Sequence, residues 1–166
     1  MSKIKTLYVL YLLFLSVFLN CNYYSVKGSL PAHLNTVAVP LFENNTAEFG
    51  IAEELTDALI VEFTRDASLQ IASPEVADVL IKGVISTINE RAGAFDQDET
   101  VQDIKIYFTV RVTCTDQVKH QEMWSSRITQ FGTYDPSEGM DARQAAYEEA
   151  YTKIGQEIIN KTVSNW

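Results

Sequence analysis

The chain has few of the residues that metal sites, disulfide frameworks and acid–base catalysis use. Its 166 residues include two histidines, His33 and His120, and two cysteines, Cys21 and Cys114. Two cysteines allow at most one disulfide, which excludes a disulfide-rich scaffold. Both histidines lie in stretches expected to be loops, and neither is spaced from another ligand residue as a helical metal motif requires. We therefore expect no metal and no cofactor.

Motifs of common catalytic and nucleotide-binding sites are missing as well. The sequence contains no GxGxxG, no phosphate-binding loop and no GxSxG. The adjacent carboxylates Glu53 and Glu54 lie on an expected helix, where neighbouring side chains point in different directions and do not form a dyad. These absences favour a non-enzymatic binding or assembly protein over an enzyme such as a secreted hydrolase.

Positive charge is also scarce. The chain has 13 Lys and Arg against 22 Asp and Glu, a formal net charge of -9. Residues 1–20 contain Lys3 and Lys5 as their only charged side chains, so their removal would lower the net charge by two, from -9 to -11. An acidic chain without a run of Lys or Arg does not attract the phosphates of nucleic acids. An anionic partner would therefore need a local basic patch.

Residues 1–20 have the layout of a secretory signal peptide. A basic start precedes an apolar run at 7–19, about 13 residues long and shorter than the roughly 20 that span a bilayer. Cys21 follows at once, where bacterial lipoproteins are cleaved and receive a lipid. Phe18 and Asn20 depart from the usual leucine and small residue of that recognition site. An uncleaved anchor or a conventional signal cut further on are the alternatives.

Hydrophobic periodicity predicts one α+β domain over residues 36–166, behind a lipidated linker of residues 21–35. Alternation of period two marks strands, and apolar spacings of three and four mark helices. Asp141 is expected to cap the last helix, and the acidic stretch 91–103 to form a hairpin loop. The expected strands are 36–42, 69–73, 78–90, 103–116 and 122–134, and the expected helices are 50–66 and 141–163.

The stretch 103–116 is the clearest element. Apolar residues alternate with polar ones over twelve positions, so one face of this strand is buried and the other exposed. Cys114 falls on the buried face, where a structural thiol is expected rather than a reactive one. In the strand 78–90, Gly83 indicates either close packing by a neighbour or a bulge. The one-sided strands predict that both helices pack on the same face of the sheet.

The sequence resembles the LptE-like lipopolysaccharide-assembly lipoproteins. The resemblance begins with "SLPAHLNTVAVPLFENNTAEFGIAEELTDALIVEFTRD", and continues with "ADVLIKGVIST", "EMWSSR" and the closing amphipathic helix. It covers Cys21 to about Val163. It implies a fold of two helices on one face of a mixed, mostly antiparallel four-stranded sheet.

The same resemblance implies a place and a role. The protein would be an outer-membrane lipoprotein on the periplasmic side, held by lipid on Cys21. It would plug a β-barrel translocon of the LptD type and assist the assembly of lipopolysaccharide. A periplasmic scaffold lipoprotein of another envelope machine, without lipopolysaccharide binding, is the alternative.

The strand pattern adds a hypothesis about binding. Four cations, Lys82, Lys105, Arg111 and Arg127, are expected on the face of the sheet opposite the helices, while the helix 50–66 carries much of the negative charge. Arg and Lys bind phosphate groups. This face is a candidate contact for lipopolysaccharide phosphates or for acidic groups of the barrel wall. Alternatively, the four side chains are only solvated.

Overall fold

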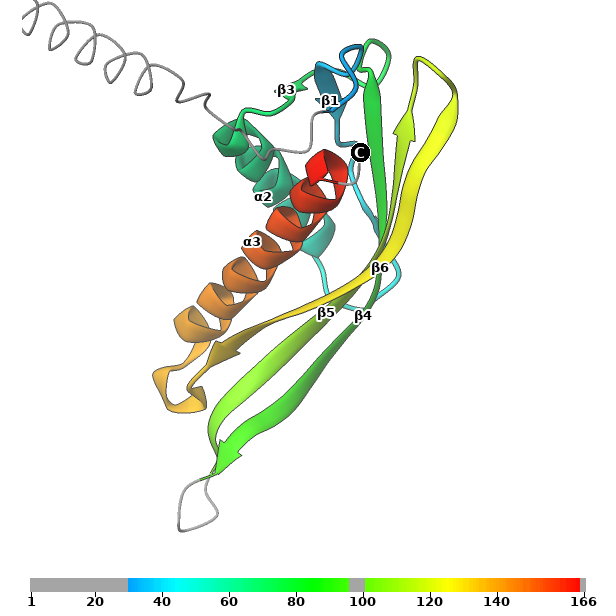
Figure 1. Cartoon of the computed structure of the whole chain (residues 1–166). Helices are drawn as coiled ribbons and strands as arrows, with labels where there is room; N and C mark the ends of the chain where they lie inside the picture. Colours follow the sequence, from blue (N-terminus) through cyan, green and yellow to red (C-terminus); the bar gives the residue numbers. More distant parts are fainter. Residues whose placement is uncertain (1–29, 96–100, 165–166) are drawn as a thin grey trace, which may run out of the picture.

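A computed structural model describes residues 30–95 and 101–164 (Figure 1). Cys21 and the expected signal peptide lie outside the described residues. The elements in chain order are β1 (Thr36–Ala38), β2 (Glu43–Asn44), α2 (Ile51–Asp66), β3 (Gln70–Ile71), β4 (Val79–Phe95), β5 (Val101–Asp116), β6 (Gln121–Tyr134), the 3-10 helix η1 (Pro136–Glu138) and α3 (Met140–Ser164).

The architecture is a two-layer α+β arrangement, as expected, with α2 and α3 on the same side of a mixed sheet (Figure 1). The strand order is β3-β1-β4-β5-β6, and β2 also pairs with β4. The long strands β4, β5 and β6 are antiparallel, whereas the short strands pair in parallel. The described sheet therefore has six strands, and the expected number of four was wrong.

The additional strands arise where the chain is interrupted. Pro40 has no N–H to donate, and of the strand expected at 36–42 only β1 forms. A second short strand, β2, follows at Glu43–Asn44, beyond the expected range. Between these two strands, Phe42 lays its ring against β4 at Gly83, in the space that a Cβ would occupy. Of the two alternatives expected at Gly83, close packing by a neighbour is therefore the one observed, and the bulge lies further along β4.

The loop expected at 91–103 was wrong. Strand β4 continues to Phe95 and β5 begins at Val101, so paired backbone occupies most of that stretch, and residues 96–100 lie outside the described part. Polar composition misled the prediction because two paired strands satisfy each other's backbone groups whether or not their side chains are apolar. The β4–β5 ribbon consequently extends beyond the ends of the helices (Figure 1).

The core lies between the helices and β5. The ring of Phe108 from β5 makes edge contacts with Tyr147 and Tyr151 of α3, at centroid distances of 5.1 and 5.3 Å. Such aromatic pairs add to the free energy gained by burying apolar area. The other fully buried large residues of these elements are Ile51, Leu55, Leu59, Phe63, Ile106, Ile154 and Ile158.

Two glycines bring α3 close to its neighbours. The backbone carbonyl of Ala146 occupies the place of a Cβ at Gly132 of β6. At Gly155, a Cβ would lie 3.1 Å from Cγ of Glu62 in α2. Glu62 is therefore buried, and its carboxylate pairs with Arg65 at 2.7 Å.

The N-terminal end of α3 differs from the prediction. The helix begins at Met140, so Asp141 lies in its first turn and is not its N-cap, as had been expected. Asp135 instead caps η1 through the amide of Ser137. Among the described residues, no helix combines the length and the apolarity needed to cross a bilayer.

Side-chain hydrogen bonds to two aspartates, Asp116 and Asp78, connect the first described residues to the sheet. Nε2 of His33 lies 2.6 Å from Oδ2 of Asp116, whose side chain is 6% exposed. Asp78 accepts hydrogen bonds from the amides of Asn35 and Thr36 and from the hydroxyl of Thr36. Burial raises the pKa of Asp116, but hydrogen bonds from His33 and the Lys119 amide outweigh it and hold the pKa below its ordinary value.

Asp116→Asn tests this connection. Because the pKa of Asp116 is lowered by folding, its carboxylate stabilises the fold above the unfolded pKa of about 3.9, and that contribution is lost as pH falls through the folded value. We expect the variant to lose about 1–3 kcal/mol of unfolding free energy at neutral pH, and this difference to shrink as the pH falls below the unfolded pKa. Denaturant titration measures both; Asp57→Asn, at an exposed position of α2, is the control. A loss that persists in acid would contradict the assignment.

Candidate functional site

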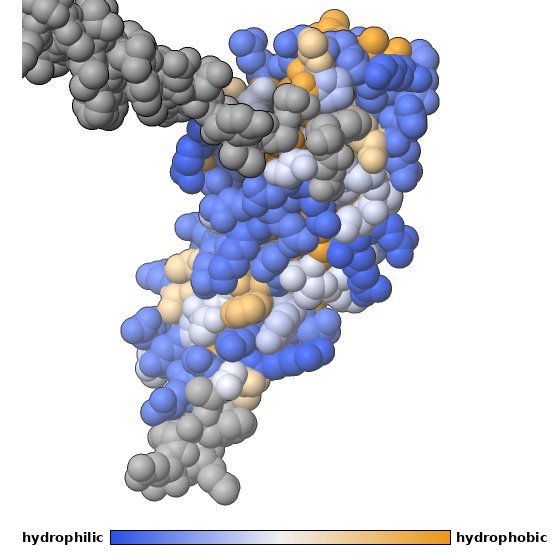
Figure 2. All heavy atoms as spheres, viewed as in Figure 1, coloured by the Kyte–Doolittle hydropathy of each residue, from blue (hydrophilic) through white to orange (hydrophobic). Residues whose placement is uncertain are grey.

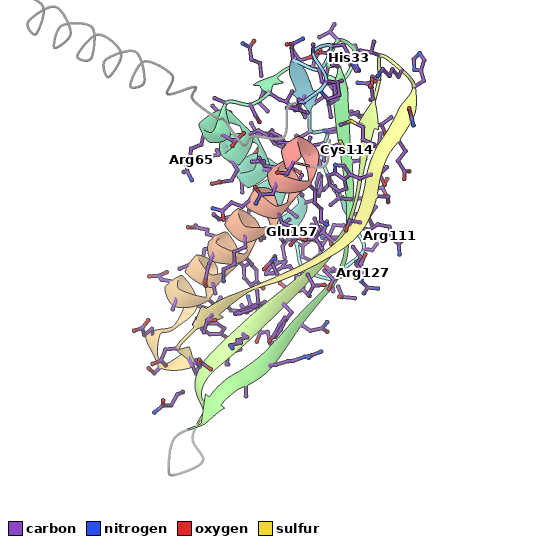
Figure 3. The ribbon with its side chains drawn as sticks, in the orientation of Figure 1. His33, Arg65, Arg111, Cys114, Arg127 and Glu157 are labelled. Carbon is purple, nitrogen blue, oxygen red and sulfur yellow. The ribbon has the colours of Figure 1, made fainter. Side chains whose placement is uncertain are left out.

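The candidate site is the face of β4, β5 and β6 that points away from the helices, called here the open face. Figure 3 shows Arg111 and Arg127 on this side of the sheet, while Glu157 of α3 lies on the other. The strand register also places Lys82 and Lys105 on the open face. All four cations predicted from the sequence therefore share this face.

The strand register arranges the open face in rows that cross three strands. Val84, Arg111 and Arg127 align to form the arginine row. Arg91, Lys105 and Thr133 align to form the lysine row, six residues further along β5 and hence about 20 Å away. The rows between and beside them are Thr87–Thr109–Thr129, Asn89–Tyr107–Phe131 and Lys82–Thr113–Ser125.

The arginine row brings two like charges directly opposite each other. The amide of Thr133 donates to Glu149, so it points away from β5. Backbone direction alternates along a strand, so the amides of Thr129, Arg127 and Ser125 also point away from β5. These residues therefore form non-hydrogen-bonded pairs with their partners in β5. Side chains approach most closely in such pairs, with Cα atoms about 4.5 Å apart. Accordingly, the hydroxyls of Thr109 and Thr129 lie 3.1 Å apart. Arg111 and Arg127 occupy the next such pair.

No carboxylate within the described ranges pairs with either arginine. Both side chains are exposed. Like charges directly opposite each other in a sheet are destabilising. An anion that bridged the two guanidinium groups would replace this repulsion by charge-assisted hydrogen bonds.

The cations of the lysine row lie against aromatic rings of the adjacent row, Asn89–Tyr107–Phe131. The guanidinium of Arg91 lies 5.2 Å from the centre of the Tyr107 ring, and Nζ of Lys105 lies 5.0 Å from that of Phe131. The Tyr107 and Phe131 rings are themselves in contact at 5.3 Å. Lys153 of α3 reaches Phe131 from the sheet edge, at 4.5 Å from its ring. Cation–π contacts fix these cations in place without neutralising their charge.

Arg91 is a candidate that sequence reasoning missed. In the first half of β4 the odd residues, such as Ile81 and Ile85, face the core. A bulge at Ser86, between Ile85 and Thr87, reverses this parity, so Arg91 faces outward. Strict alternation along β4 would have placed Arg91 inward, and the stretch had been assigned to a loop.

The opposite layer of the molecule is acidic. Glu53, Asp57 and Asp66 of α2 are exposed on the helical side. In the view of Figure 2, blue hydrophilic residues dominate the surface and orange apolar residues form small areas. The helical layer therefore carries an excess of negative charge and the open face an excess of positive charge, although the net charge of the whole chain is negative.

Cys114 and the potential metal ligands of the described residues can be placed directly. Cys114 is a free, buried cysteine whose Sγ lies 3.7 Å from Sδ of Met123, and burial raises the pKa of its thiol to about 12. This confirms the expected structural thiol. Within the described ranges, no three His, Cys, Asp or Glu side chains form a group that could hold a metal ion.

Arg127→Gln tests the repulsion in the arginine row. Removing one charge should raise the free energy of unfolding by about 0.2–1 kcal/mol at low ionic strength, and added salt should reduce the gain. Thermal and denaturant unfolding at two salt concentrations measure this. Lys82→Gln is the matched control, because Lys82 stands opposite the neutral Thr113. An equal gain in both variants would refute a pairwise repulsion.

Comparison with known proteins identifies a family and a fold. Residues 34–162 match the model of the LptE family, described as lipopolysaccharide-assembly. The matched span includes β1 to β6 and most of α3. No curated protein sequence matches the chain.

Solved structures share the fold at low sequence identity. A PelC dodecamer from Paraburkholderia phytofirmans aligns with a TM-score of 0.57 and 12% identity, over 83% of this chain and 95% of that one. A hypothetical protein from Chlamydia trachomatis aligns with a TM-score of 0.56 and 10% identity, over 78% and 98%. A minor lipoprotein from Acinetobacter baumannii gives a TM-score of 0.50 and 12% identity, over 79% and 96%.

These identities establish a shared fold only, whereas the family model matches most of the sequence itself. The resemblance seen in the sequence is thereby confirmed. The two-layer fold and the match over residues 34–162 show that this chain belongs to the LptE family of lipopolysaccharide-assembly proteins.

Proposed function

We propose that this protein is a non-enzymatic outer-membrane lipoprotein that plugs a lipopolysaccharide-translocating β-barrel of the LptD type and assists the assembly of lipopolysaccharide. Membership of the LptE family supports a role in lipopolysaccharide assembly. The fold supports a binding role, because it offers a broad cationic sheet face and no group of metal-ligating side chains among the described residues. The open face contacts lipopolysaccharide phosphates or acidic groups of the barrel wall.

The arginine row is the observation that carries this proposal. Arg111 and Arg127 stand directly opposite each other and have no carboxylate partner in the described part of the chain. A phosphate group accepts paired hydrogen bonds from guanidinium groups and would neutralise both charges. Lys82 lies on the adjacent row, and Lys105 with Arg91 adds a second cationic position along the same strands.

Lipid on Cys21 would hold the domain at the periplasmic side of the outer membrane. Two acyl chains anchor a protein stably, whereas one gives marginal binding. Eight residues separate Cys21 from Leu30, where the described chain begins. An extended linker of this length reaches about 30 Å, so the end of the domain that carries His33 would remain near the membrane surface.

Reversing both arginines, Arg111→Glu with Arg127→Glu, tests the contact with lipopolysaccharide. We expect capture of lipopolysaccharide to fall at least about tenfold, since two charge-assisted contacts become repulsive. The melting temperature should hardly change, because a like-charged pair is exchanged for another. Lys119→Glu with Lys161→Glu, outside the open face, changes the net charge equally and should bind as the parent does. Capture unchanged by the arginine reversal would exclude the contact.

The proposed partner and anchor are tested together in native membranes. Purification of the tagged full chain from outer membranes should retain a large β-barrel protein, and the mass of the protein should show cleavage before Cys21 and a lipid on its thiol. Recovery of components of another envelope machine would favour the scaffold alternative. An intact N-terminus in the mass spectrum would show that Phe18 and Asn20 prevent processing.

A further inference from the structure

Strand β6 is an edge of the described sheet, and α3 covers part of that edge. The amide of Thr133 donates to Oε2 of Glu149 at 2.9 Å, and the carbonyl of Phe131 accepts from Nζ of Lys153 at 2.9 Å. Both partners come from α3. The backbone of β6 is thus capped by helix side chains over its last residues, in the manner of a blocked edge.

The preceding part of the same edge is not capped. Because backbone direction alternates along a strand, Ser125, Arg127 and Thr129 point their N–H and C=O groups outward as Phe131 and Thr133 do. Among the described residues, none of these groups has a hydrogen-bond partner. All three residues are exposed. We call Ser125–Thr129 the uncapped edge.

The uncapped edge has defined limits. At one end a bulge at Met123 shifts the register of β6 against β5, and at the other the contacts of Phe131 with α3 begin. Between these limits β6 is regularly paired with β5, and this pairing keeps the strand extended. Such an edge is a template for an added strand, where main-chain hydrogen bonds supply affinity and alternate side chains supply specificity.

Charge decides which strand fits. Two copies of this chain paired antiparallel through their uncapped edges in full register would place the two Arg127 side chains opposite each other, beside Arg111 in each copy. Like charges so placed are destabilising. A different strand with a carboxylate opposite Arg127 would instead place a negative charge at the end of the arginine row, where the attraction to Arg127 is favourable.

We propose that the uncapped edge binds an extended segment of another protein that carries acidic residues at alternate positions. The segment adds to β6 as a further strand of the sheet, with its carboxylates on the open face next to Arg127. Arg127 thus has two effects, because it opposes pairing with a second copy and selects an acidic strand. This binding uses the backbone of β6 and does not depend on lipopolysaccharide capture.

Thr129→Pro, compared with Thr129→Ala, isolates the backbone contribution. Proline removes an outward N–H and is tolerated on edge strands, and both variants lose the hydroxyl contact with Thr109 equally. The probe is a labelled peptide of alternating glutamate and valine, titrated into the full chain in detergent. We expect Thr129→Pro to weaken its binding about tenfold or more relative to Thr129→Ala. Equal binding by the two folded variants would overturn the proposal.

Two further measurements separate strand addition from simple charge attraction. A peptide of alternating glutamate and proline keeps the charge but cannot pair, and a peptide of alternating lysine and valine can pair but has the wrong charge; both should bind at least about tenfold more weakly. In the unmodified chain, the acidic peptide should slow hydrogen–deuterium exchange in 121–134 at the uncapped edge. Unchanged exchange there, or equal binding of all three peptides, would refute strand addition even if Thr129→Pro fails to fold.

Discussion

The structure depends on the two-faced pairing of β5 with its neighbours β4 and β6. The inner side chains of β5, from Ile106 to Cys114, are fully buried under the helices. A one-residue slip would turn these side chains to solvent, so burial of this face fixes the register of all three long strands. The same register then determines which polar side chains meet on the outer face. The arginine row is a consequence of core packing as much as of local sequence.

This coupling explains how an acidic chain presents a cationic surface. The helices bury their apolar stripes on the inner face of the sheet and leave the carboxylates of α2 in solvent on the other side of the molecule. Pairing with β4 and β6 collects the outward cations of three strands, which lie up to 45 positions apart between Lys82 and Arg127. Such a surface attracts anions even though it is exposed to water, because the electrostatic fields of several like charges add.

The helix α3 has two separate effects on the sheet. Its inner stripe closes the core through Tyr147 and Tyr151, and its close approach at Gly132 lets Glu149 and Lys153 reach the edge of β6. Because the helix caps only the last part of that edge, the backbone at Ser125–Thr129 remains available. The limit of the helix contact therefore defines the position of a surface that composition does not indicate.

The sequence by itself determined the elements with strong periodicity. It predicted α2, the alternation of β5, the inward position of Cys114 and the four cations of the open face, because side-chain direction follows from a period of two or 3.6. The family followed separately, from the resemblance of particular stretches of the sequence. Only the tertiary structure decided the features that depend on pairing. The bulge at Ser86 turned Arg91 outward, backbone pairing replaced the expected loop at 91–103, and register set Arg111 opposite Arg127. These features arise from contacts between strands, which no periodicity within a single strand records.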